Sequence, residues 1–132
     1  MSDERLHIAV GVIFNQRKDH VLIARRPDHV HQGGLWEFPG GKCKKGEDII
    51  MALKRELYEE LNLIIDACDS LITINHNYSD QHVKLDVWSV NDWHGDISGK
   101  EGQIIEWVSL SQLSQRAFPQ ANKEIIKAIQ SN

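Results

Sequence analysis

The feature that most constrains this chain is a glycine-bearing loop that runs directly into an acidic amphipathic helix. Gly40 and Gly41 open the loop, and Asp48 is a good N-cap because its carboxylate can accept from the N–H groups of the first helical turn. After Asp48, apolar residues recur at steps of three and four, which is the spacing of one helical stripe. The stripe consists of Ile50, Leu53, Leu57 and Leu61. The spacing predicts a helix that begins after Asp48, ends near Leu61 and packs on a core.

Three carboxylates occupy a second face of the same helix. Glu56, Glu59 and Glu60 stand at i, i+3 and i+4, so they are surface neighbours beside the apolar stripe. Like charges at this spacing cost about 0.2–0.5 kcal/mol, and the negative end of the helix dipole disfavours them further. A hard divalent cation, held by carboxylates and substrate phosphates, explains the arrangement. The alternative is a solvated acidic face balanced by Lys54 and Arg55; the preceding glycine loop favours the cation.

Size and composition indicate one globular domain. The chain has 132 residues, of which 41% are apolar and 26% charged. A net charge of −4 argues against a basic face for a nucleic-acid polymer. No apolar run could span a bilayer, the first residues have no secretory character, and Cys43 and Cys68 form no CxxC motif. We therefore expect a cytoplasmic single domain over residues 1–132 with reduced thiols and no membrane contact. We also expect a monomer, although no feature of the sequence bears on the oligomeric state.

The rest of the chain reads as strands, turns and one more helix. Strands are expected at 6–14, 21–25, 72–78, 82–90 and 103–108, with a short one leading from Leu35 into the glycine loop. Residues 63–71 are ambiguous, and the polar segment 91–102 is expected to be a loop. A final helix turns Ile125, Ile126 and Ile129 inward. His29 and His31 lie in a loop without further ligands nearby, so we expect simple loop polarity there. Helices around a mixed sheet, the α/β class, are the natural packing.

The loop and helix together resemble the Nudix box. The matching positions are Gly41, Glu47, Arg55-Glu56-Leu57, Glu59-Glu60 and Leu63, at the spacing of that motif. Asn62 stands where the family has glycine. Asparagine is the next best tolerated residue in a left-handed conformation, so we expect a small stability cost and an intact site. The resemblance implies a Nudix-type α/β/α sandwich with a mixed β-sheet.

Outside the box, the chain is similar to the MutT branch of this family. The similar segments are 8–13, 25–26, 35–42, 100–103, 106–107, 118–119 and 121–122. The similarity implies hydrolysis of 8-oxo-dGTP to the nucleoside monophosphate and pyrophosphate with Mg²⁺, or alternatively Mn²⁺, which cleanses the nucleotide pool and prevents mutation. Another nucleotide, such as a cytidine or methylated nucleoside triphosphate, is the alternative substrate. A non-catalytic domain is disfavoured because every carboxylate of the box is present.

The resemblance also implies roles for individual residues in the reaction. The implied metal ligands are Glu56, Glu59, Glu60, the Gly40 carbonyl and, with triphosphate bound, Glu101. Glu47 would pair with Arg55 and orient the helix carboxylates. Glu56 is the expected general base and Glu101 the competitor.

Substrate contacts are implied further along the chain. Asn122 would select the base, because an amide offers both a donor and an acceptor to the edge of an 8-oxopurine; its alternative use is as N-cap of the last helix. Arg26 would be a second base or phosphate contact, with a surface arginine as the alternative. Lys42 is the lysine nearest the loop and would reach a phosphate as a mobile charge.

Two aromatic residues complete the expected site. Phe38 and Tyr78 could border the base, although core packing is the commoner use of either side chain. Gln81 stands where the MutT pattern has a basic residue, so a charged contact is not expected at that position.

Overall fold

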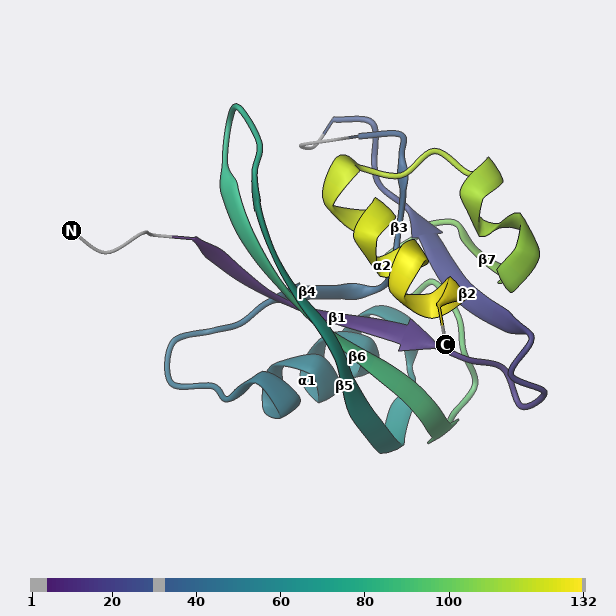
Figure 1. Ribbon diagram of the computed structural model, residues 1–132. Helices are drawn as coiled ribbons and strands as arrows, with labels where there is room; N and C mark the ends of the chain where they lie inside the picture. Colours follow the sequence, from purple (N-terminus) through teal and green to yellow (C-terminus); the bar gives the residue numbers. More distant parts are fainter. Residues whose placement is uncertain (1–4, 30–32, 132) are drawn as a thin grey trace.

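The computed structural model describes residues 5–29 and 33–131, and its strands form two sheets (Figure 1). The first sheet has the order β4-β1-β6-β5, with β1 and β6 parallel and the other neighbours antiparallel. Its strands are β1 (Leu6–Ile13), β4 (Gly40–Lys42), β5 (Ile64–Asn77) and β6 (His82–His94). The second sheet is antiparallel, with the order β3-β2-β7. Its strands are β2 (His20–Arg25), β3 (Trp36–Glu37) and β7 (Ile105–Ser109).

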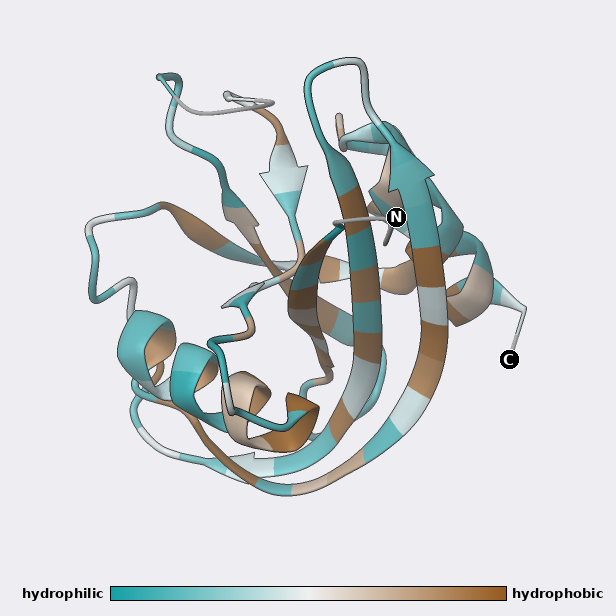
Figure 2. Cartoon of the chain, turned by 90° about the vertical axis from the view of Figure 1, so that its left-hand side faces the viewer, coloured by the Kyte–Doolittle hydropathy of each residue, from teal (hydrophilic) through white to brown (hydrophobic). Residues whose placement is uncertain are grey.

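The helices lie on opposite sides of the first sheet. Helix α1 (Ile49–Leu61) packs on β1, β4 and β5, whereas α2 (Gln120–Gln130) packs on β5 and the 3-10 helix η1 (Leu110–Gln115) (Figure 1). The long strands carry alternating hydrophobic and hydrophilic bands in Figure 2, as expected for strands with one buried face. This arrangement confirms the α/β class and the α/β/α layering, with the refinement that the strands divide between two sheets.

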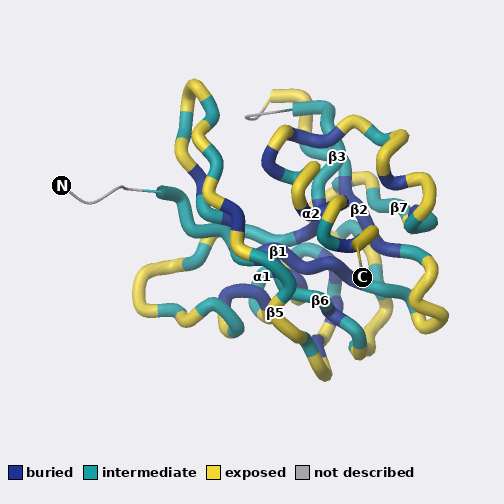
Figure 3. Tube along the Cα trace, in the orientation of Figure 1, coloured by how far each residue is buried: buried dark blue, intermediate teal, exposed yellow. Residues whose placement is uncertain are grey.

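Strand β1 is the centre of the molecule, and its two faces belong to two different cores. Ala9 and Ile13 pack with the α1 leucines, while Val10 and Val12 pack with the α2 isoleucines. All residues from Ala9 to Ile13 are buried (Figure 3). Gly11 faces α1, where a Cβ atom would lie 3.1 Å from Leu57 Cδ1. The helix that carries the acidic residues is therefore seated tightly on the central strand.

The ends of α1 follow the sequence closely. The Asp48 carboxylate accepts from the Met51 N–H at 2.9 Å, as expected for an N-cap. At the other end, Asn62 has φ 61° and ψ 30°, which is the left-handed conformation expected at the box glycine position. The helix therefore begins and ends where the sequence predicted.

The structure changes the predictions for three other segments. The ambiguous segment 63–71 becomes the first half of β5. The expected loop 91–102 is wrong for its first four residues, because Asn91–His94 continue β6 by pairing with β5. The glycine loop begins as a strand, since Gly40–Lys42 pair with Ile8–Val10. In each case a distant partner strand supplies the hydrogen bonds. His31 lies outside the described residues, and no helix in the described part of the chain is long and apolar enough to cross a membrane.

Candidate functional site

A cavity of about 390 Å³ opens between β1, β4 and the start of α2. Its floor is apolar and is formed by Leu6, Ile8, Val10, Val83 and Leu85. Its rim brings together seven of the predicted site residues, namely Arg26, Phe38, Gly40, Lys42, Glu60, Tyr78 and Asn122. An apolar floor with convergent polar groups is typical of a small-molecule site. The other five predicted residues, Glu47, Arg55, Glu56, Glu59 and Glu101, do not line this cavity.

Glu60 is the carboxylate that connects the helix to the cavity. Its Oε2 atom is buried, and among the described residues it is the one such side-chain oxygen without a hydrogen-bond partner. Burial, followed by the nearby charges of Glu56, Glu37 and Glu101, raises the pKa of Glu60 to about 8, against a partly opposing hydrogen bond from the Gly40 backbone. An unpaired buried oxygen is costly in a protein interior. This oxygen is therefore suited to a ligand that supplies positive charge.

Arg55 organises the neighbouring carboxylates. Its Nε and Nη2 atoms donate to the two Glu47 oxygens at 2.6 and 3.0 Å, and its Nη1 atom donates to Glu56 at 2.8 Å and Glu59 at 3.3 Å. Hydrogen bonds from Arg55 and from the Lys44 N–H lower the pKa of Glu47 to about 2. Glu47 is thus an ionised anchor for Arg55, which in turn holds the acidic face of α1.

Gly41 leaves room for the Glu56 carboxyl group. A Cβ atom at Gly41 would lie 2.2 Å from Glu56 Cδ and Oε2, and one at Gly40 would lie 1.9 Å from the Ala9 carbonyl oxygen. Glycine is therefore required twice in succession, once for a carboxylate and once for strand pairing with β1. The glycine loop and the acidic helix fit each other as a unit.

The acidic side chains do not form a ready-made ligand cage. Within residues 5–29 and 33–131, no three His, Cys, Asp or Glu side chains are arranged to hold a metal ion. The Glu56 and Glu59 carboxylates are bound by Arg55 instead. The chemistry of the donors nevertheless fits a hard divalent cation, because carboxylate oxygens are its preferred ligands and Glu60 Oε2 has no other partner.

The base-contact candidates meet at the start of α2. The Ala121 N–H donates to the Tyr78 hydroxyl at 2.9 Å, and Asn122, the third residue of the helix, follows it on the cavity rim. The N-cap of α2 is Pro119, so the alternative use of Asn122 as N-cap is wrong. Phe38 is 3% exposed and stacks on Phe118 at 5.3 Å, which makes it a core residue whose edge also lines the cavity.

Sequence reasoning missed Glu37. Its carboxylate pairs with Arg26 Nη1 at 2.5 Å on the cavity rim, and burial is the main cause that raises its pKa. The available signal was an acid between two aromatic residues, Trp36 and Phe38, in a short strand next to the glycine loop. Arg26 is therefore not a plain surface arginine, because a half-buried acid, Glu37, pairs with it at the site.

Glu101 and Lys42 lie at the periphery. Both residues are exposed. The Lys42 carbonyl accepts from Arg55 Nη2 at 3.0 Å, which fixes the backbone while the side chain extends toward solvent. Glu101 lies on the loop after β6, and its charge contributes to the raised pKa of Glu60. The structure thus places Glu101 within electrostatic reach of the cavity acid, although it does not line the cavity.

Helices on both sides of a mixed sheet, with the acidic helix α1 packed on the glycine-bearing strand β4, define a protein of the α/β/α class. Residues 9–128 match the family model described as the NUDIX domain, so the chain belongs to the Nudix family.

The relatives indicate a branch of that family. The chain is 41% identical over 102 residues to an 8-oxo-dGTP diphosphatase of Proteus vulgaris, with 77% of this chain and 90% of the relative covered. It is 38% identical over 123 residues to the 8-oxo-dGTP diphosphatase of Escherichia coli K12, covering 93% and 95% of the two chains. A CTP pyrophosphohydrolase of the same organism is 32% identical, covering 92% and 90%.

A solved structure gives the same result for the fold. A MutT structure from a study of the Aliivibrio salmonicida and Vibrio cholerae proteins superposes with a TM-score of 0.87 at 34% identity. The superposition covers 97% of this chain and 98% of that one. The Nudix fold expected from the sequence is confirmed.

Proposed function

We propose that this chain is a divalent-cation-dependent nucleoside triphosphate pyrophosphohydrolase that converts 8-oxo-dGTP to 8-oxo-dGMP and pyrophosphate. The observation that carries the proposal is the buried, unpartnered Glu60 oxygen on the rim of a cavity that also presents the Asn122 amide. Similarity to 8-oxo-dGTP diphosphatases over most of the chain supports the substrate. The activity would reside in one Nudix hydrolase domain over residues 1–132, acting as a cytoplasmic monomer that cleanses the nucleotide pool.

Divalent metal is a general requirement of Nudix hydrolases, and we propose Mg²⁺, with Mn²⁺ as a substitute. The residues that would hold it are Glu56, Glu59, Glu60, the Gly40 carbonyl and, with nucleotide bound, Glu101. When bound, such a cation activates water and neutralises charge on the phosphoryl oxygens.

The chain's own residues would orient the reaction and move the proton. A water oxygen would bond to the α- or β-phosphorus, the bond from that phosphorus to the oxygen that bridges the two would break so that this oxygen leaves on the other phosphate, and a water proton would pass to the Glu56 carboxylate. Arg55 holds that carboxylate at 2.8 Å, and the Glu47–Arg55 pair fixes the guanidinium. Lys42 would offset phosphate charge at the open side of the cavity. The orientation of the Glu56 carboxylate is therefore set by Arg55 and Glu47, which do not line the cavity.

Base selection would fall to Asn122. Its amide can accept from the N7–H and donate to the O6 of an 8-oxopurine, whereas ordinary guanine has an unprotonated N7 that cannot donate. Tyr78 supports this segment through its hydrogen bond with the Ala121 N–H. Arg26, paired with Glu37, would contact the base or a phosphate from the cavity rim.

A panel of triphosphates tests the proposal. Pyrophosphate release should be strongly faster with 8-oxo-dGTP than with dGTP, CTP or 5-methyl-dCTP at equal concentration. Comparable rates with 8-oxo-dGTP and dGTP would contradict the proposed specificity for 8-oxo-dGTP but would still agree with a nucleoside triphosphate pyrophosphohydrolase. Preference for CTP would favour the second candidate, which the related CTP pyrophosphohydrolase and the uncharged Gln81 on the rim support.

A further inference from the structure

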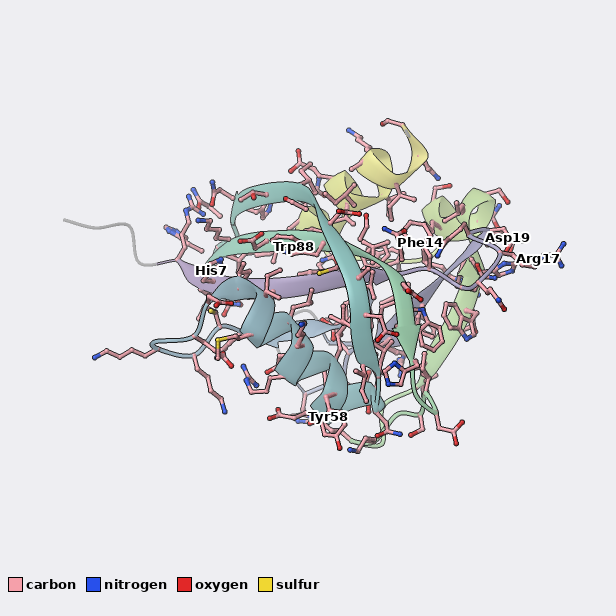
Figure 4. The ribbon with its side chains drawn as sticks, turned by 90° about the horizontal axis from the view of Figure 1, so that it is seen from below. His7, Phe14, Arg17, Asp19, Tyr58 and Trp88 are labelled. Atoms are coloured by element: carbon pink, nitrogen blue, oxygen red, sulfur yellow. The ribbon has the colours of Figure 1, made fainter. Side chains whose placement is uncertain are left out.

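The loop that follows β6 closes over the carboxyl end of α1. The Lys100 N–H donates to the Glu60 carbonyl at 3.0 Å, and the Ser98 N–H donates to the Leu61 carbonyl at 3.1 Å. The Lys100 ammonium lies 4.9 Å from the ring centre of Tyr58, which Figure 4 shows on the outer surface of α1. The last carbonyls of a helix have no partner within the helix, so this loop completes α1.

The side-chain amide of Gln103 connects the end of α1 to the loop after β6. Gln103 Nε2 donates to the Glu60 carbonyl at 3.2 Å, and Gln103 Oε1 accepts from the Glu101 N–H at 3.0 Å. A single planar amide therefore ties together the backbones of two residues that are 41 positions apart, 101 minus 60. Because the donor and acceptor belong to the same rigid group, the bridge fixes the separation of the two main chains.

Two glycines, Gly99 and Gly102, allow the loop backbone to pass close to the Gln103 residue. A Cβ atom at Gly99 would lie 2.3 Å from the Gln103 carbonyl oxygen and 3.4 Å from Gln103 Oε1. Gly102 has φ +79°, which lets the chain turn back between Glu101 and Gln103. Gln103 itself is half-buried, so its hydrogen bonds are partly sheltered from water.

We propose that Gln103 is a positioning residue that sets the distance between Glu60 and Glu101 and thereby the divalent-cation affinity of the nucleotide-bound site. The inference rests on the proposed function, in which both carboxylates hold the cation. Glu101 is exposed on a loop, so its carboxylate can occupy a fixed position near Glu60 only if hydrogen bonds fix the main chain of Glu101. Groups that orient ligand residues in this way typically alter metal affinity 10-fold to 100-fold when removed.

The test compares Gln103→Met with Asn62→Gly. Methionine keeps the length of the side chain and removes both hydrogen bonds of the bridge. Asn62 Nδ2 donates to the Asp96 carbonyl at 3.2 Å and so holds the same loop at its other end. Glycine is tolerated at the left-handed φ of Asn62, and the control therefore loosens the loop without touching Glu101.

Two readouts are needed. The first is Mn²⁺ affinity, measured by electron paramagnetic resonance with the methylene analogue of dGTP that resists cleavage between the α- and β-phosphates. Gln103→Met should weaken it about tenfold, and Asn62→Gly should leave it within twofold. The second is hydrogen exchange of the Glu101 amide, which should accelerate in Gln103→Met but not in Asn62→Gly. Gln103→Ala, which adds no volume, should reproduce both effects.

The Glu101→Gln variant distinguishes a failure of the positioning role of Gln103 from a failure of the proposed function. If the unsubstituted protein binds no Mn²⁺ with the analogue, the proposed function fails. If Glu101→Gln weakens Mn²⁺ binding while Gln103→Met and Gln103→Ala do not, the positioning role is overturned and the proposed function stands. Equal losses in Gln103→Met and Asn62→Gly would also overturn it, because a generally loosened loop would then explain the result.

Discussion

Arg55 donates hydrogen bonds to both carboxylate oxygens of Glu47, from Nε at 2.6 Å and from Nη2 at 3.0 Å. The third nitrogen of the same guanidinium lies 2.8 Å from Glu56 Oε1. A bidentate pair of this kind fixes the plane of the guanidinium as well as its position. The orientation of Glu56 is therefore set through Arg55 by an anion, Glu47, that lies nine residues earlier in the chain than Glu56.

Glu47→Gln should lower kcat about 10-fold to 100-fold with little change in KM. The neutral amide cannot replace both charge-assisted bonds, so Arg55 is released and Glu56 loses its fixed orientation. Steady-state kinetics with 8-oxo-dGTP measure the effect. Glu124→Gln, which removes an exposed acid from α2, is the matched control and should behave like the unsubstituted protein. An unchanged kcat in Glu47→Gln would show that the pair does not serve the reaction.

Gly41→Ala should reduce activity far more than stability. The new methyl group would lie 2.2 Å from the Glu56 carboxyl, which is the mobile end of a side chain and can move aside at the expense of its position. We expect a loss of kcat of at least about tenfold with a shift of a few degrees in Tm. Gly46→Ala is the control, because it suffers backbone strain at φ +83° but meets no atom within 4 Å. A fully active Gly41→Ala would contradict the packing argument.

The stability of the metal-free protein should fall as the pH rises from about 5 to about 8. The folded pKa of Glu60 is raised to about 8, so the folded state holds a proton that the unfolded state releases above its ordinary value near 4.5. The stabilisation is thus present below about pH 4.5 and is lost through pH 8, by up to about 1.4 kcal/mol per pH unit. Urea unfolding with a chelator present measures it.

Glu60→Gln is the comparison for this pH dependence. Glutamine cannot ionise, so its unfolding free energy should change less between pH 5 and pH 8 than that of the unsubstituted protein. Mg²⁺ should reduce the same dependence, since a bound cation favours the carboxylate. Identical slopes for both proteins would show that Glu60 does not hold the proton.

Asn122→Ala should narrow the preference for 8-oxo-dGTP over dGTP by about tenfold in kcat/KM, because one polar base contact is lost. The rate with dGTP should change much less than the rate with 8-oxo-dGTP. Gln120→Ala, which alters an exposed residue in the first turn of α2, should keep the preference. Equal losses with both nucleotides would assign Asn122 to general binding and not to base selection.

The parts of this molecule that local chemistry decides could be predicted from the sequence. The Asp48 cap, the leucine stripe of α1 and the left-handed Asn62 each depend on residues within a few positions of one another. Six of the twelve site candidates lie in the contiguous box between Gly41 and Leu63, and seven of the twelve lie on the cavity rim.

The parts that depend on distant partners could not be predicted. Asn91–His94 contain three polar residues and Trp93, and they become strand because β5 offers hydrogen-bonding partners. Glu37 gains its role only when Arg26 is brought beside it across β2 and β3. The Gln103 bridge requires the end of α1 and the loop after β6 to meet, which nothing in the spacing along the chain reveals.

Anomalous diffraction from crystals soaked with Mn²⁺ and the methylene analogue of dGTP tests whether the carboxylates of α1 hold a cation. Anomalous peaks are expected between the acidic face of α1 and the phosphates, within bonding distance of Glu56, Glu59 or Glu60 and of the Gly40 carbonyl. A nucleotide bound in the cavity with its Mn²⁺ elsewhere, or with no Mn²⁺ near these carboxylates, would show that the acidic face of α1 is not a cation site.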